Sequence, residues 1–243
     1  MTMWLSVDPM ADKYPSISPY AYCAWNPVKF VDPNGMIVDS SFIPIFVKLL
    51  LDPTNKKYNQ GFATLYKKLD EDPLTTYRFI ESEKYDDGGE TMYGGKDGDR
   101  DIINIFYSIG HSRRAEEGCL LEESFHAFQF LQGDFGYLLT ETGEFQGMLA
   151  FDRVDEVEAK IYASQNVRFK TRFERKLLEA AGKSDRINAV WSFLEDNPSV
   201  DFSAYINLLP NRISMSDLNV LYHSNGTAYT NSVNIVGRKN IIQ

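Results

Sequence analysis

Residues 112–133 read SRRAEEGCLLEESFHAFQFLQG, and this stretch contains the helix on which the assignment of fold and site depends. Ser112 is a favourable N-cap, because its hydroxyl can accept a hydrogen bond from a free backbone N–H of the first turn. Gly133 is a favourable stop, because glycine readily adopts the left-handed backbone that ends many helices. The stretch therefore predicts a helix over about residues 113–132.

Three side chains near the middle of this helix could carry chemistry. Residues four positions apart lie one above the other on a helix face, so Glu122 and His126 project together. Glu123 lies about a third of a turn to the side. A single histidine on an amphipathic helix is usually structural, but a carboxylate and an imidazole at this spacing can also be metal ligands. The apolar residues that would bury the helix are Leu120, Leu121, Phe125, Ala127 and Phe128.

The segments on either side of this helix mix helical and strand patterns, which places the chain in the α+β class. Residues 101–107, DIINIFY, have the β-branched and aromatic composition of a strand. Residues 86–99 are rich in glycine and acidic residues and are expected to form a loop or a hairpin tip. The other expected elements are a helix over 56–70, a strand over 77–80, a hairpin over 134–151, a helix over about 153–181 and a helix over about 186–196.

The chain is acidic, with 25 Lys and Arg residues against 34 Asp and Glu residues and a formal net charge of −9. Proteins that follow nucleic-acid phosphates or anionic membrane surfaces need a basic face, so nucleic acid is not an expected partner. Aromatic residues make up 14% of the 243 residues, whereas disordered chains are poor in them. We therefore expect a folded domain with a sizeable core.

Cysteine content and hydropathy argue against disulfide-rich, cysteine-liganded zinc and membrane-spanning proteins. The two cysteines, Cys23 and Cys119, are too few for a disulfide framework or for a zinc site built from cysteines. They could form one disulfide or stay as two free thiols. The longest apolar run, residues 42–51, contains Pro44 and Lys48 and is too short to span a bilayer. The N-terminus lacks the basic segment and apolar stretch of a signal peptide.

Residues 4–35 differ from the rest of the chain. Five of the ten prolines fall in this segment, which excludes a long helix and predicts an irregular, proline-rich arm of turns. The short motifs in the arm are Asp8-Pro9, Lys13-Tyr14-Pro15-Ser16, Ser18-Pro19-Tyr20, Tyr22, Asn26-Pro27-Val28 and Asp32-Pro33-Asn34-Gly35.

These motifs resemble the pattern that ends the Rhs (YD-repeat) associated core. In that family the pattern marks the junction after which a variable C-terminal domain begins, and that domain is often a toxin. The resemblance implies that residues 1–35 are a remnant of the core and that residues 36–243 are the variable domain.

The segment Glu122-Glu123-Ser124-Phe125-His126 resembles the active-site helix of zincin metallopeptidases. The HExxH motif of that helix has two zinc-binding histidines and a glutamate as general base. Here Glu122 replaces the first histidine, so the motif is EExxH, and the resemblance assigns Glu123 as the base. Zinc also accepts carboxylate oxygen. The extra negative charge could shift the preference toward manganese or another oxygen-preferring metal, or leave the site inactive and without metal.

Zincins with a glutamate ligand take it from a downstream helix, where an acidic residue lies three positions before an alanine. Residues 155–163, DEVEAKIYA, fit this pattern, and Glu156 aligns with the ligand. Glu158 is the adjacent alternative, but it would point about 200° away on the helix, so only one of the two can serve. The resemblance also implies that the strand over residues 101–107 is an edge strand.

The two resemblances together imply a C-terminal domain of an Rhs-type polymorphic toxin or effector. Its zincin-like fold would combine an active-site helix, a small antiparallel sheet and C-terminal helices. The domain would bind zinc, act on a peptide or protein substrate and pair with a cognate immunity protein, either in the cytoplasm or after export as an Rhs effector. The alternatives are a catalytically inactive zincin-like binding module and a structural end-piece of an Rhs protein. His111 and His223 are further candidates for the site.

Overall fold

The computed structural model describes residues 43–83, 88–108, 113–140, 142–198, 209–210, 221–222, 228–229 and 234–237. The chain divides between Lys48 and Leu49 into two units, and all the elements from α2 onward belong to the second. The expected proline-rich arm and its boundary with the variable domain near Gly35 lie outside the described residues.

The described residues form helices and short strands in mixed order, which confirms the α+β class. The helices are α1 (Ile45–Leu51), α2 (Gln60–Asp70), α3 (Arg113–Gln132), α4 (Arg153–Asn166), α5 (Arg172–Ala181) and α6 (Arg186–Asp196). The strands are β1 (Thr75–Ser82), β2 (Gly89–Asp97), β3 (Arg100–Ser108), β4 (Gly136–Leu139), β5 (Phe145–Leu149), β6 (Leu221–Tyr222), β7 (Ala228–Tyr229) and β8 (Asn234–Val236).

The sheet nearest to α3 has three strands in the order β1-β3-β2. β1 pairs with β3 in parallel and β2 pairs with β3 antiparallel. The expectation that residues 101–107 form an edge strand is therefore wrong, because they lie in the central strand of this mixed sheet. The sequence indicates a loop or a hairpin tip over residues 86–99. The hairpin is present, because β2 pairs antiparallel with β3 and the turn lies at residues 98–99, but most of the segment is the strand β2, which buries Thr91 and Tyr93.

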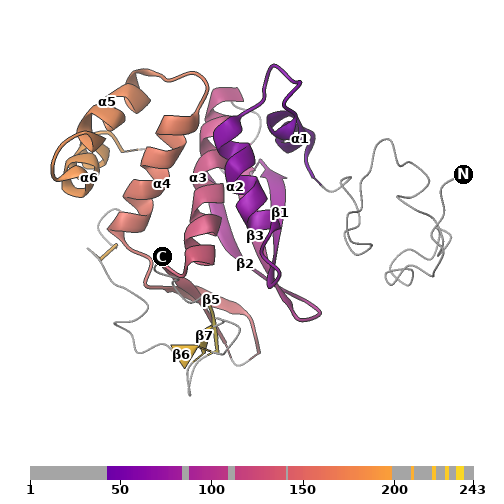
Figure 1. Ribbon diagram of the computed structural model, residues 1–243. Coiled ribbons are helices and arrows are strands. Elements are labelled where there is room, and N and C mark those ends of the chain that lie inside the picture. The colour runs from indigo at the N-terminus through magenta and orange to yellow at the C-terminus, as the bar shows by residue number, and fades with distance from the viewer. Residues whose placement is uncertain are drawn as a thin grey trace, which may run out of the picture. The chain divides into compact units, whose positions relative to one another are not determined.

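Helices α2 and α3 pack on this sheet, α4 packs beside α3, and α5 and α6 pack beyond α4 (Figure 1). α3 contacts the sheet and both neighbouring helices, so it is buried along its middle, where Leu120, Leu121 and Ala127 are fully inaccessible. α3 and α6 confirm the helices predicted over 113–132 and 186–196. The chain reverses at Gly133, whose φ of 81° is in the left-handed region that suits glycine.

A second, antiparallel sheet with the order β5-β4-β8 follows α3 in the chain. Its core is an aromatic cluster in which Phe130 of α3 packs on Phe135 and Tyr137 with ring centroids 5.2–6.2 Å apart. This cluster fixes the C-terminal end of α3. No helix among the described residues is long and apolar enough to cross a membrane.

The helix predicted over 153–181 is in fact two helices, and its single-helix assignment is wrong. α5 has its own start, because Thr171 is the N-cap and forms a capping box with Glu174. In the connection before it, the guanidinium of Arg168 binds both carboxylate oxygens of Glu117 on α3, at 2.9–3.0 Å. The local cap and this tertiary contact together end α4 at Asn166.

Candidate metal centre

Three acidic or imidazole side chains from α3 and α4 meet between the two helices. Glu122 and His126 lie one turn apart on α3, and Glu156 lies in the first turn of α4. One potential ligand atom from each residue lies within 4.8 Å of the other two. His126 and Glu156 are buried, and Glu122 is partly exposed. The structure thus brings together the three residues that the sequence resemblance assigned as metal ligands.

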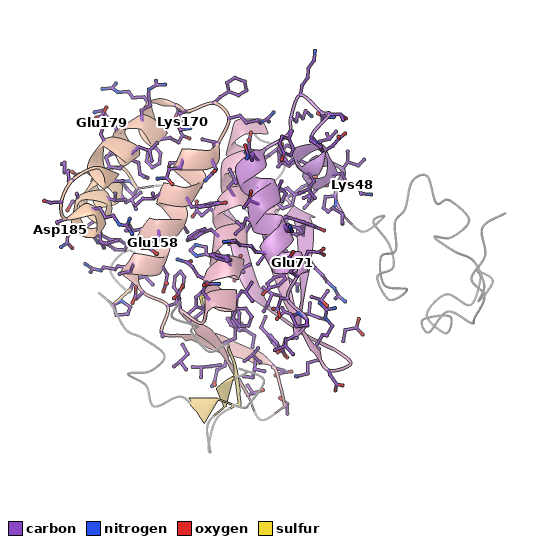
Figure 2. The ribbon with its side chains drawn as sticks, in the orientation of Figure 1. Lys48, Glu71, Glu158, Lys170, Glu179 and Asp185 are labelled. Atoms are coloured by element: carbon purple, nitrogen blue, oxygen red, sulfur yellow. The ribbon has the colours of Figure 1, made fainter. Side chains whose placement is uncertain are left out.

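The start of α4 determines which of its acidic residues faces α3. Asp152 accepts hydrogen bonds from the backbone N–H groups of Val154 and Asp155, and the Asp155 carboxylate accepts one from the N–H of Asp152. Glu156 then points inward. Glu158 lies on the side of α4 that faces α6 (Figure 2), where Arg186 donates to its Oε1 at 2.7 Å. The alternative ligand Glu158 is therefore not at this site.

Hydrogen bonds hold the imidazole of His126 in one orientation. Its Nδ1 lies 2.8 Å from the side-chain oxygen of Gln129, and the Gln129 amide donates to the backbone oxygen of Asp155 at 2.9 Å. An amide oxygen can only accept, so Nδ1 carries the proton of this bond. Nε2 lies 3.5 Å from Oε2 of Glu156. Metal-binding histidines usually have this arrangement, in which Nδ1 donates to a fixed oxygen and Nε2 faces the site.

Glu123 is also buried, but it faces β2 rather than α4. The Thr91 hydroxyl lies 2.8 Å from both Oε2 and the backbone oxygen of Glu123. The hydroxyl has one proton, so it can donate to only one of these two oxygens at a time. If the Glu123 carboxyl is protonated, the hydroxyl can donate to the backbone oxygen and accept from the carboxyl. Burial raises the pKa of Glu123 to about 8. A protonated Glu123 carboxyl satisfies both contacts of the Thr91 hydroxyl at once, and burial shifts its pKa in the direction that favours this form.

The close contact between Glu123 and β2 depends on a glycine. A Cβ atom at Gly89 would lie 2.6 Å from Cγ of Glu123 and 2.8 Å from the sulfur of Cys119. Any side chain at this position would therefore move β2 away from α3. Cys119 is a free, buried thiol that donates to the backbone oxygen of Gly88 at 2.9 Å, and Cys23 lies outside the described residues.

The sequence did not indicate the fifth member of the site, Lys160. Its ammonium Nζ lies 2.5 Å from Oε1 of Glu122 and 3.6 Å from Oε1 of Glu156. Burial alone would lower the pKa of Lys160, but the negative charges of Glu122 and Glu156 outweigh burial and raise it, so the group stays charged. The one sequence feature that could have predicted this contact is the four-residue spacing from Glu156 to Lys160, which puts the two side chains on the same face of a helix.

The site is balanced in charge without a metal ion. Burial would lower the pKa of His126, but its hydrogen bond to Glu156 and the negative charges of Glu156 and Glu122 raise it to about 9. Two cationic side chains, His126 and Lys160, therefore face the carboxylates of Glu122 and Glu156. Buried charges persist only when they are compensated in this way.

The donor atoms nevertheless fit a divalent cation. Zinc binds imidazole nitrogen and carboxylate oxygen at roughly 2.0–2.2 Å, which puts two of its ligands about 3.4 Å apart in a tetrahedral site. The 3.5 Å between His126 Nε2 and Glu156 Oε2 meets this spacing. The donor atoms of all three residues lie within 4.8 Å of one another. One nitrogen and two oxygens suit zinc or manganese.

Raising the pH should lower the free energy of unfolding of the metal-free protein. The folded-state pKa is raised from 4.5 to about 8 for Glu123 and from 6.5 to about 9 for His126. The native protein therefore keeps protons that the unfolded chain releases, and stability falls as the pH rises through these windows. We expect a loss on the order of 5 kcal/mol between about pH 6 and pH 9, measured by urea unfolding.

The variant Glu123→Gln is the control for this pH dependence. Glutamine does not titrate and has nearly the shape of a protonated glutamate. The contribution of Glu123 to the fall of unfolding free energy with pH, between its unfolded pKa of 4.5 and its folded pKa of about 8, should therefore disappear. A variant with the slope of the wild type would show that Glu123 is not buried in its protonated form.

His111 and His223, the two further candidates, lie outside the described residues. No protein-family model, curated protein or solved structure gives a significant match to this chain.

Proposed function

We propose that residues 36–243 are a zincin-like, metal-dependent peptidase domain with an altered EExxH motif, at the C-terminal end of an Rhs-type toxin or effector. The observation that carries the peptidase proposal is the meeting of Glu122, His126 and Glu156 from two helices, with Glu123 adjacent on α3. The Rhs assignment, and with it a cognate immunity protein as partner, rests on the sequence motifs of residues 4–35.

Each side chain has a distinct part in this proposal. Glu122, His126 and Glu156 would hold the metal, with His126 oriented by Gln129. A bound divalent cation would supply Lewis-acid polarisation of a peptide carbonyl and lower the pKa of water. Glu123 would accept a proton from the attacking water and transfer it to the leaving amine. A nearby cation favours the ionised form of a carboxyl, which would convert Glu123 from its protonated form to a base.

Metal binding and hydrolysis measured on the same preparation test this proposal. Protein freed of metal by a chelator should take up one Zn²⁺ or Mn²⁺ per chain and cleave an unfolded protein or a mixture of peptides. His126→Ala should weaken metal binding by roughly 100-fold or more, because it removes the nitrogen ligand. Glu158→Ala, which changes a carboxylate on the other side of α4, should leave binding unchanged. Neither metal uptake nor cleavage by the wild type would refute the proposal.

One observation favours the second candidate, a catalytically inactive zincin-like binding module. Lys160 already neutralises Glu122 at 2.5 Å, so the site needs no metal ion to be stable. A module of this kind would fold fully in the presence of a chelator, take up no metal at micromolar concentrations and hydrolyse nothing.

A further inference from the structure

Lys160 makes ion pairs with two of the three proposed metal ligands. Glu156 lies on the same helix, one turn before Lys160, and Glu122 lies across the interface on α3. The ammonium and the Glu122 carboxylate are each largely buried, with side-chain exposures of 18% and 17%, and Glu156 is 1% exposed. This is a buried three-membered ion cluster, unlike the solvent-exposed pairs on the surface of the domain.

A metal ion and this ammonium would compete for the same two carboxylates, Glu122 and Glu156. The Lys160 nitrogen lies nearest to Oε1 of Glu122 and Oε1 of Glu156, while His126 approaches the other oxygen of Glu156. A cation bonded to Glu122 and Glu156 would be close enough to the ammonium to repel it strongly in a buried site. Lys160 therefore has to leave at least Glu122 before a metal can be held by all three ligands.

We propose that Lys160 is a built-in competitor of the metal, a side chain that holds Glu122 and Glu156 together in the metal-free protein and is displaced when a divalent cation binds. This inference rests on the proposed metal site. It accounts for the preformed geometry of the ligands, because an internal cation keeps two buried carboxylates facing each other. Lys160 also lowers the metal affinity, because every binding event has to break at least the ion pair between Lys160 and Glu122.

The variant Lys160→Met tests this role, because methionine keeps much of the apolar stem but has no charge. In a calorimetric titration with Zn²⁺ or Mn²⁺, we expect the Kd of Lys160→Met to be roughly 10- to 100-fold lower than that of the wild type, the range that neighbours of a metal site commonly control. The metal-free variant should also have a lower Tm than the wild type, and saturating metal should raise its Tm by more.

Lys67→Met is the matched control, since Lys67 forms an exposed pair with Glu71 at the same four-residue spacing and should leave both readouts unchanged. Equal metal affinity in Lys160→Met and the wild type would overturn the competitor role and leave the metal site standing. No binding by either protein would overturn both. Should Lys160→Met fail to fold, Lys160→Arg keeps the charge with a two-pronged donor and should bind metal more weakly than the wild type; unchanged or tighter binding would overturn the inference.

Discussion

Glu123→Gln should lower the rate of peptide hydrolysis by roughly 10²- to 10⁴-fold, the contribution of a positioned general base. Glutamine keeps the size of the side chain and can still meet the Thr91 hydroxyl, but it cannot accept the proton of water. Metal affinity should stay within about threefold of the wild type, because Glu123 faces β2 and is not one of the three ligands. Initial rates on a quenched-fluorescent peptide at saturating metal, together with a metal titration, measure both effects.

Glu158→Gln provides the control for this loss, because it makes the same chemical change on α4 at a carboxylate that pairs with Arg186 away from the site. Its hydrolysis rate should equal that of the wild type. Hydrolysis by Glu123→Gln at a rate close to the wild type would remove Glu123 from the proposed mechanism. Loss of metal binding in the same variant would instead make Glu123 part of the metal site.

Glu117→Ala should destabilise the fold by roughly 3–5 kcal/mol, the cost of removing one partner of a buried ion pair. Glu117 is 2% exposed, binds Arg168 through both oxygens and accepts a hydrogen bond from the Asn59 side chain at 2.7 Å. The variant leaves the guanidinium and the amide without this partner where α3 meets the α4–α5 connection and the N-terminus of α2. Urea unfolding followed by circular dichroism measures the change in midpoint.

A second glutamate–arginine pair calibrates this prediction. Glu158 and Arg186 are 2.7 Å apart, but their side chains are 35% and 55% exposed. Glu158→Ala should therefore cost no more than about 1 kcal/mol, as exposed pairs do. Equal losses in the two variants would mean that burial does not determine the contribution of the Glu117 pair.

Local sequence signals predicted the elements that build the site. The helix over 113–132 followed from its end at Gly133 and its apolar residues, and the helix expected from residue 153 begins there as α4. Helical geometry alone placed Glu122 with His126, and the 200° between Glu156 and Glu158 meant that one of them had to face away. These inferences needed no partner from elsewhere in the chain.

Contacts between distant segments could not be predicted from local sequence patterns. Thr91 and Glu123 are 32 positions apart, and Glu117 and Arg168 are 51 apart, so neither pair forms a local pattern. The parallel pairing of β1 with β3 likewise depends on β2 occupying the other side of β3. The break before α5 was different, because Thr171-x-x-Glu174 is a capping box that the sequence displays.

Lys160 makes one contact that a local sequence pattern could predict and one that depends on a distant segment. Its spacing from Glu156 is local, but the position of Glu122 on α3 gives the ammonium its second carboxylate and makes it part of the site. A lysine four residues after a glutamate is common on exposed helices, where it contributes little. Only the packing of α3 on α4 buries this pair and places it among the proposed ligands.

The position of a bound metal ion in a crystal tests the central claim most directly. Crystals grown without metal and soaked in Zn²⁺ should give one anomalous scattering peak roughly 2.0–2.2 Å from Nε2 of His126 and from a carboxylate oxygen of each of Glu122 and Glu156, with Lys160 withdrawn from Glu122. The absence of a peak at these three residues at saturating Zn²⁺, with the Lys160 ion pairs intact, would contradict the claim that they form a metal site.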